Sequence, residues 1–140
     1  MQNIPTWLPV VAVALSDGNG RWLMHRRPEG KQHAGLWEFP GGKVESDENP
    51  VLALIREAQE ELGITLRQQH LQPLAFADDA LLDASHGIVI LLYRAAKWQG
   101  EPQALEGGAV AWFTLSELDA LPKPPLDHVL ARALAENAVQ

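Results

Sequence analysis

The stretch GGKVESDENPVLALIREAQEELGI, residues 41–64, constrains the fold most, because it combines a complete helix signal with closely spaced carboxylates. Asn49 is suited to cap the start of a helix, and Pro50 fits its first position. Gly63 suits the left-handed residue that ends one. Apolar residues recur at helical spacing between these signals and predict a buried stripe: Val51, Leu54, Ile55, Ala58 and Leu62. The sequence therefore predicts a helix ending just before Gly63.

Three carboxylates, Glu57, Glu60 and Glu61, fall on a different face of this predicted helix. Glu57 and Glu61 are four residues apart, a like-charge spacing that costs about 0.2–0.5 kcal/mol. The acids also lie near the helix C-terminus, where the helix dipole favours cations. Most charge runs are solvated helix faces. A divalent cation such as Mg²⁺, which binds converging carboxylate oxygens, would instead relieve both conflicts.

Several apolar runs predict strands around this helix. Residues 7–15, WLPVVAVAL, are too few to span a bilayer and predict a buried strand. We expect that strand to form a hairpin, through the turn DGNG, with a return strand over residues 22–26. The continuous aliphatic run 86–98 predicts a strand covered on both faces, and AVAWFTL, 109–115, predicts a short further strand.

The end of the chain predicts a second amphipathic helix. Its apolar positions follow the spacing i, i+3, i+4, i+7 and i+8: Leu126, Val129, Leu130, Ala133 and Leu134. Strands covered on both faces, combined with two amphipathic helices, indicate the α/β class, with a mixed sheet sandwiched between helices. We expect a single domain over residues 1–140.

Composition limits the partners of the chain. With 18 acidic and 11 basic residues the net charge is −7, which argues against a broad face for a nucleic-acid polymer or an anionic membrane. There is no cysteine, which fits a reducing compartment, and no Lys or Arg precedes Arg21, so we expect no signal peptide and a cytoplasmic protein. No histidine pair shows ligand spacing, so none is assigned to metal: His25, His33, His70, His86 and His128.

The helical stretch resembles the Nudix box, G-x5-E-x7-R-E-U-x-E-E-x-G-U, in which U is a bulky aliphatic residue. Gly42 opens the pattern, Glu48 follows after five residues, and Arg56 with Glu57 after seven more. The one departure is Ala58 at a U position, which affects packing more than chemistry. Three segments outside the box are similar to the MutT-type nucleoside triphosphate pyrophosphohydrolases: LWEFPGGK, the RR that ends the predicted hairpin, and WQGEPQALEGG. The resemblance covers most of the chain and weakens over residues 65–85.

The resemblance implies attack of water on an internal phosphorus of a nucleoside triphosphate, which gives the monophosphate and pyrophosphate, with Mg²⁺ as cofactor and Mn²⁺ as a possible substitute. It implies that Glu57, Glu60 and Glu61 are the metal-binding and catalytic carboxylates, with Glu57 as the base that orients water and Glu61 as the firmest metal ligand. The carbonyl of Gly41 and the carboxylate of Glu106 are further implied metal ligands. A solvated loop acid is the alternative for Glu106.

Arg56 cannot bind a metal ion, and its catalytic contribution would be to hold a carboxylate in place. A surface salt bridge is the alternative. We expect Glu48 to pair with Arg56 or to reach the metal through water.

The implied substrate site includes Arg27, whose planar guanidinium matches phosphate oxygens, together with Gly41 and the preceding residues Glu38, Phe39 and Pro40. Phe39 would face the base, and core packing is its alternative. Small residues at the Pro-Gly-Gly turn allow the backbone to approach a ligand.

Two residues bear on the identity of the base. Members selective for oxidised guanine carry an asparagine just before the last helix, and the ungapped alignment places Leu126 there. Leu126 also fits the apolar stripe, and the next residue, Asp127, could accept a hydrogen bond from the base edge instead. The expectation is therefore an 8-oxo-dGTP diphosphatase-like enzyme of nucleotide-pool sanitation and DNA repair. The alternatives are a (d)CTP-preferring pyrophosphohydrolase or a non-catalytic nucleotide-sensing module. The expected partner is a small-molecule nucleotide, and whether the protein is a monomer or a homodimer stays open.

Overall fold

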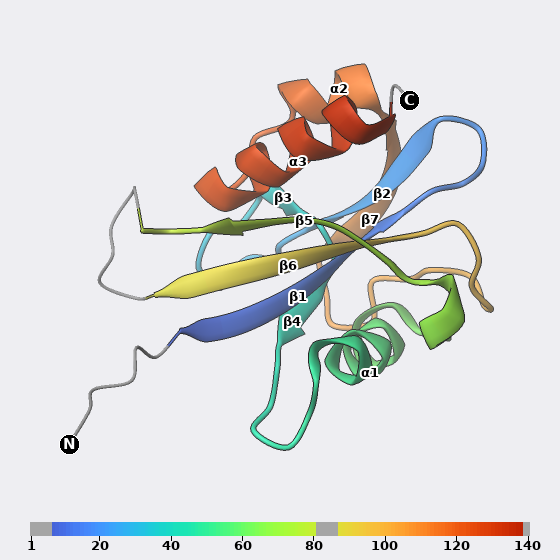
Figure 1. The fold of residues 1–140 in the computed structure, drawn as a ribbon. Helices are drawn as coiled ribbons and strands as arrows, with labels where there is room; N and C mark the ends of the chain where they lie inside the picture. The colour runs from blue at the N-terminus through green and yellow to red at the C-terminus, as the bar shows by residue number, and fades with distance from the viewer. Residues whose placement is uncertain (1–6, 81–86, 139–140) are drawn as a thin grey trace.

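The computed structural model describes residues 7–80 and 87–138, which form two sheets with helices on both sides (Figure 1). The four-stranded sheet has the order β4-β1-β6-β5, with β1 Leu8–Leu15, β4 Gly41–Lys43, β5 Gln72–Asp78 and β6 Ile88–Ala95. The three-stranded sheet has the order β3-β2-β7, with β2 Arg21–Arg26, β3 Trp37–Glu38 and β7 Ala109–Thr114. β1 runs parallel to β6 and antiparallel to β4, so the first sheet is mixed, as expected.

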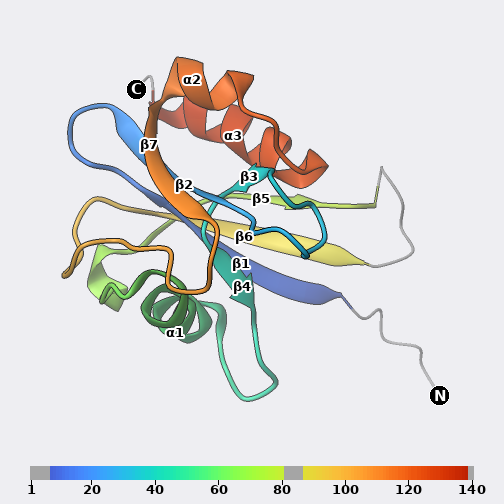
Figure 2. The same ribbon diagram turned by 180° about the vertical axis from the view of Figure 1, so that it is seen from behind.

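The helices cover opposite faces of the four-stranded sheet (Figures 1 and 2). They are α1 Pro50–Leu62, the 3₁₀ turn η1 Gln68–His70, α2 Leu115–Ala120 and α3 Pro125–Ala138. Alternate side chains of β1 point into two separate cores. Val11, Val13 and Leu15 pack in the cluster that contains the buried face of α1, whereas Ala12 and Ala14 pack in the cluster that contains α3. The expected sandwich of a mixed sheet between helices is therefore confirmed.

The predicted hairpin between β1 and β2 is wrong beyond its turn. Ser16 and Trp22 form an isolated antiparallel bridge, and the N–H of Asp17 donates to the carbonyl of Arg21. Further on, the two strands separate into different sheets. The physical reason is that β4 and β6 occupy both edges of β1, so no edge remains for β2.

The ends of α1 agree with the prediction. The side chain of Asn49 accepts a hydrogen bond from the N–H of Leu52, and Gly63 adopts the left-handed conformation with φ 71°. Both interactions are local, which explains why the sequence predicts them well.

The predicted apolar stripe of α3 needs a correction. Val129 is 51% exposed, and the buried face consists of Asp127, Leu130, Ala131 and Leu134. Packing of α3 against β5 and α2 selects this face. Asp127, which is not part of the apolar pattern, is therefore buried, and Val129 is exposed. The sequence does not predict α2, β5 or the two short strands β3 and β4. Of the run predicted as a strand over residues 86–98, β6 contains Ile88–Ala95, and Gly87 before it and Ala96, Lys97 and Trp98 after it are not part of the strand. His86 itself lies outside the described residues.

Within the described residues, no helix is long and apolar enough to cross a membrane.

Candidate active site

The three carboxylates of α1 occupy three different environments. Glu60 is 51% exposed at its side chain, Glu57 is largely covered, and Glu61 is 8% exposed as a residue. Glu61 turns toward β2, where it lies close to His25. The acidic face expected from the helical spacing is therefore divided between solvent and the protein interior.

Arg56 holds the exposed half of this cluster together. Its Nε and Nη2 donate to the two carboxylate oxygens of Glu48 at 2.7 and 2.9 Å. Its Nη1 donates to Glu57 at 2.9 Å and to Glu60 at 3.2 Å, and Nη2 also donates to the carbonyl of Lys43. The Arg56 guanidinium lowers the pKa of Glu48 to about 2. The predicted pairing of Glu48 with Arg56 is present, and Arg56 fixes the position of Glu57.

Two glycines let the backbone of β4 approach its neighbours. A Cβ on Gly42 would overlap the carboxylate of Glu57, so this position shapes the cradle in which that carboxylate lies. A Cβ on Gly41 would overlap the carbonyl oxygen of Val11 on the adjacent strand. Gly41 is therefore required for strand pairing, and Gly42 for the placement of Glu57.

The buried half of the cluster contains two polar atoms without a hydrogen-bond partner among the described residues, His25 Nδ1 and Glu61 Oε1. They lie 3.9 Å apart, and Glu38 Oε1 lies 3.8 Å from the same nitrogen. On the other side of the ring, Nε2 lies 2.9 Å from the carbonyl oxygen of Gly107. Because a carbonyl can only accept, Nε2 carries hydrogen, and Nδ1 faces the two carboxylates.

The pKa values follow from this arrangement. Burial raises the pKa of Glu61 to about 8; the charge of His25 opposes this shift, and the charges of Glu38, Glu57 and Glu106 add to it. The Glu38 carboxylate raises the pKa of His25, against the effect of burial. Burial also raises the pKa of Glu57. The site therefore concentrates more negative charge than its buried surroundings favour, and a cation would relieve it.

The His25 ring and the carboxylates of Glu38, Glu61 and Glu106 line a pocket of about 170 Å³, which we call the carboxylate pocket. Its lining residues are His25, Arg27, Pro28, Lys31, Glu38, Gly41, Glu61 and Glu106. Glu106 reaches the pocket because its loop is bound to the end of α1. The N–H groups of Gln103 and Leu105 donate to the carbonyls of Leu62 and Glu61, both at 3.0 Å. These bonds satisfy two helix-terminal carbonyls and bring the predicted residue Glu106 to Glu61.

The predicted substrate residues divide between the pocket and the core. Arg27 Nη1 donates to Glu38 at 3.0 Å, and both residues line the carboxylate pocket. The carbonyl of Pro40 accepts from the N–H of Val13 at 2.9 Å. Phe39 is 3% exposed and packs in the apolar cluster next to α3, so in this structure its ring is a core side chain. Its contact with a base stays a prediction.

Leu126 and Asp127 lie at the start of α3. Leu126 is half-buried against the same apolar cluster. Asp127 is 6% exposed, and its carboxylate accepts a hydrogen bond from the N–H of Phe39 at 3.2 Å. Burial raises the pKa of Asp127 to about 7. Contact of either residue with a base stays a prediction.

Three pocket residues, His25, Pro28 and Lys31, are not among the site residues that the sequence predicts. A signal for His25 was present. Because alternate residues of a strand share a face, His25 lies on the side of β2 that continues to Arg27, the predicted phosphate contact. Spacing between histidines does not indicate that His25 and Arg27 lie on the same side of the strand. Lys31 lies in a glycine-containing loop, where no pattern predicts its position.

The residues fit a divalent cation by their chemistry, although in the described part of the chain no group of three or more His, Cys, Asp or Glu side chains is arranged to hold one. Arg56 binds oxygens of Glu57 and Glu60 in this structure. In favour of a cation are the buried Glu61 oxygen without a partner and the cradle that Gly42 leaves for Glu57. An oxygen-rich donor set of this kind suits Mg²⁺.

Comparisons with known proteins agree with this fold. The family model described as NUDIX domain matches residues 6–136. The 8-oxo-dGTP diphosphatase of Buchnera aphidicola is 36% identical over 111 residues, which cover 79% of this chain and 86% of that protein. The CTP pyrophosphohydrolase of Escherichia coli is 35% identical over 124 residues, 88% of each chain. The solution structure of the E. coli ORF135 protein superposes with a TM-score of 0.81 at 34% identity, covering 96% of this chain and 93% of the other.

Proposed function

Because the chain belongs to the Nudix family and is a MutT-like Nudix pyrophosphohydrolase, we propose that it hydrolyses a nucleoside triphosphate to the monophosphate and pyrophosphate with Mg²⁺ as cofactor. The observation that carries the proposal is the buried Glu61 oxygen without a hydrogen-bond partner in a pocket that Arg27 also lines. This arrangement supports a cation bound at Glu61 beside a phosphate bound at Arg27.

The proposed metal ligands are Glu57, Glu60 and Glu61, with the Gly41 carbonyl and Glu106 completing the set. When bound, Mg²⁺ neutralises phosphate charge and activates water, and Mn²⁺ would substitute for it. Burial and the unpartnered oxygen support Glu61 as the firmest ligand. Glu60, which is exposed and bound to Arg56, is the more peripheral of the three helical carboxylates.

The chain's own side chains would perform the remaining steps. Glu57, held in place by Arg56 and the Gly42 cradle, would orient the attacking water and accept its proton. Arg27 would exchange part of its contact with Glu38 for the phosphate chain of the substrate. Lys31, exposed at the mouth of the carboxylate pocket, is placed to meet the same charge.

We propose 8-oxo-dGTP as the substrate, with a role in sanitising the nucleotide pool and so in DNA repair. The second candidate is a (d)CTP-preferring enzyme. Leu126, half-buried at the position where the alignment expects an asparagine, favours that alternative. Both activities occur in the names of relatives at similar identity.

The test is pyrophosphate release, with Mg²⁺ and with chelator, across 8-oxo-dGTP, dGTP, dCTP, CTP and 5-methyl-dCTP. We expect release that requires the metal and is fastest with 8-oxo-dGTP, expressed as a ratio of kcat/KM. A lead for a cytosine nucleotide would replace the first substrate with the second. Absence of release from every nucleotide in the presence of metal would contradict the proposed reaction and support a sensing module.

A further inference from the structure

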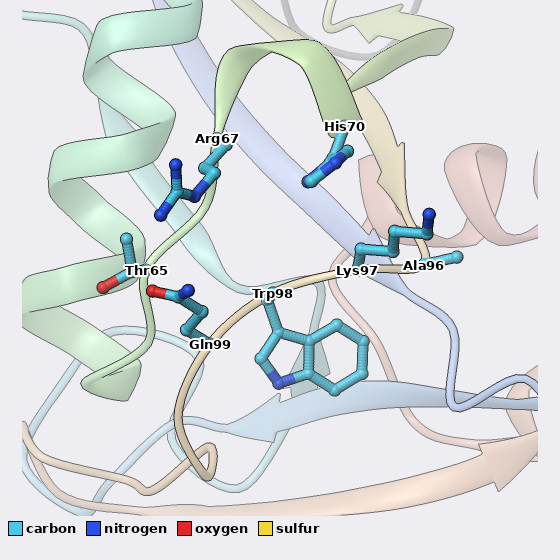
Figure 3. Close-up of a pocket in the computed structure, with 7 residues that line it drawn as sticks. All are labelled: Thr65, Arg67, His70, Ala96, Lys97, Trp98 and Gln99. Atoms are coloured by element: carbon cyan, nitrogen blue, oxygen red, sulfur yellow. The ribbon is translucent and has the colours of Figure 1, made fainter.

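A larger pocket lies apart from the carboxylate pocket and shares no lining residue with it. It has a volume of about 500 Å³ and is formed between the turn after α1 and the segment after β6 (Figure 3). Its lining residues are Thr65, Arg67, His70, Ala96, Lys97, Trp98 and Gln99. A neighbouring pocket of about 420 Å³ shares His70, Ala96 and Lys97 and adds Arg94, Gln69 and Gln72 among others. Because the two pockets share these three residues, we treat them together and call them the basic groove.

The charge of the basic groove is opposite to that of the whole chain. Arg67, Arg94 and Lys97 are three of the 11 basic residues, and no Asp or Glu is among the lining residues. Within the described residues, none of these three cations has a carboxylate within 4.0 Å, the distance that defines the ion pairs of Arg27 and Arg56. In a chain of net charge −7, such a concentration of uncompensated cations attracts anions locally.

Both walls of the basic groove are tied down. The backbones of Thr65 and Gln99 exchange two hydrogen bonds, at 2.9 and 3.1 Å, which join the two segments. Trp98 stacks on Trp112 with ring centroids 5.9 Å apart, and its indole N–H donates to the carbonyl of Gly100. The positions of the cations therefore rest on a bonded framework, which lowers the entropic cost of binding a ligand.

The polar side chains select a phosphorylated ligand. Arginine and lysine donate to phosphate oxygens, and Gln69 and Gln99 add neutral donors around them. Arg94 Nη2 donates to Gln72 Oε1 at 3.1 Å, which orients this guanidinium. Figure 3 shows Arg67 and His70 on the wall that follows α1 and Lys97, Trp98 and Gln99 on the facing wall, so an anion between them can contact both. The 18 acidic residues of the chain disfavour a polymer whose charged backbone continues beyond the groove.

We propose that the basic groove is a second binding site, for a di- or triphosphate chain on a small molecule, and that binding there needs no metal. The phosphate chain would come from free pyrophosphate or from a nucleotide. In the carboxylate pocket the cations Arg27 and Lys31 lie among three carboxylates, whereas the lining of the groove contains cations and no Asp or Glu. The inference goes beyond the proposed reaction and holds whether or not the chain hydrolyses a given nucleotide.

The experiment is titration calorimetry of the full chain with pyrophosphate and with a nucleoside diphosphate, in chelator, so that no metal-bridged phosphate can enter the carboxylate pocket. The test variant is Arg67→Ala/Lys97→Ala, whose side chains are exposed and make no ion pair among the described residues. The control is Lys43→Ala/Arg132→Ala, which removes the same charge from exposed positions outside the groove. Circular dichroism checks that both variants are folded.

We expect metal-independent binding to the wild type that weakens at least tenfold in the test variant and stays near the wild-type value in the control, since the test variant removes two charged donors to the phosphate oxygens. No binding of either probe at millimolar concentration would overturn the inference, and so would equal weakening in both variants. Tighter binding of a single-stranded oligonucleotide than of the diphosphate would overturn the assignment to a small molecule.

The two sources of the phosphate chain are separated by the relative affinity of the two probes. Tighter binding of the nucleoside diphosphate, lost in part in Trp98→Phe while the affinity for pyrophosphate is unchanged in that variant, would identify a nucleotide with its base near the indole. Equal affinity for both probes would identify the phosphate chain alone. Both results support the groove as a phosphate site. Pyrophosphate release plays no part in this readout, so failure of the proposed reaction remains distinguishable from failure of the groove.

Discussion

The carboxylate pocket and the basic groove differ in how their charged side chains are compensated. In the pocket, the cationic side chains of Arg27 and the nearby Arg56 are bound to carboxylates, and a buried acid, Glu61, is left without a partner. In the groove, Arg67 and Lys97 make no ion pair among the described residues. The pocket is therefore suited to take a cation first and an anion through it, whereas the groove is suited to an anion directly.

The two regions also differ in how their side chains are held. Glu61 and His25 are buried on α1 and β2, where packing restricts them. Arg67 and Lys97 are exposed on segments that follow α1 and β6. A buried carboxylate such as Glu61 is held in one position and lacks a partner, which raises the free energy of the protein without a cation and suits catalysis. Exposed cations such as Arg67 and Lys97 suit reversible binding.

The largest effect should come from removing the charge of the pocket. Glu61→Gln and Glu57→Gln should each lower kcat by about 10²–10⁴-fold, because the amide can neither bind the metal as strongly nor act as a base. The measurement is pyrophosphate release at saturating Mg²⁺. Metal-independent binding of pyrophosphate to the basic groove should be unchanged in both variants, which serves as the control. Unchanged turnover in both would remove the argument for a metal site.

The next effect concerns Asp127, a buried carboxylate outside the carboxylate pocket, and tests whether its ionised form lowers the free energy of unfolding. The pKa of Asp127 is raised from 3.8 to about 7, so the folded state holds a proton that the unfolded state has lost between these values. The free energy of unfolding should therefore fall as pH rises from 4 to 7 and then level, by on the order of 2–4 kcal/mol for this group.

Asp127→Asn keeps an oxygen that can accept from the N–H of Phe39 but removes the titration. We expect the variant to be more stable than the wild type at pH 8 and of similar stability at pH 4, as measured by urea unfolding at both values. The same dependence on pH in variant and wild type would assign the titration to another group.

A smaller effect is expected from the arginine that positions the pocket. Arg56→Ala releases Glu48, Glu57 and Glu60 at once, and loss of a group that orients metal ligands typically lowers metal affinity 10–100-fold. The measurement is the Mg²⁺ concentration that gives half-maximal turnover. Arg56→Lys should retain the charge but not the several directed hydrogen bonds. Its Mg²⁺ requirement should therefore lie between that of the wild type and that of Arg56→Ala. An unaltered Mg²⁺ requirement in Arg56→Ala would reduce this residue to a surface ion pair.

The smallest effect is expected at the C-terminal end of α1, between Glu61 of the pocket and Thr65 of the groove. Gly63 ends α1 with φ 71°, and a Cβ there would lie 3.0 Å from Leu105 Cδ1, in the loop that carries Glu106. Gly63→Ala should destabilise the protein by about 1–2 kcal/mol, from backbone strain and displacement of that loop. Gly18→Ala is the control, since Gly18 has φ 81° but nothing within 4 Å of the added carbon. Equal losses in thermal unfolding would show that the loop contact contributes nothing.

The sequence was most informative where the determining interactions are short in range. The cap at Asn49, the stop at Gly63 and the spacing of Arg56 with the glutamates all act within a few residues, and the structure contains the two caps and the ion pairs. The family and the mixed sheet between helices were also predicted correctly. The roles of the individual carboxylates and of the substrate residues stay predictions.

The tertiary structure decided what depends on contacts between distant segments. It placed β2 in a second sheet because β4 and β6 fill both edges of β1. It buried Glu61 against His25, while Glu60, one residue earlier, stayed in solvent. It also assembled the basic groove from the segments 65–72 and 94–99, neither of which contains a cluster of basic residues by itself. Sequence spacing fixes which face of a helix or strand a residue occupies, but the pairing of strands and the packing of that face decide whether the residue meets water, a carboxylate or another cation.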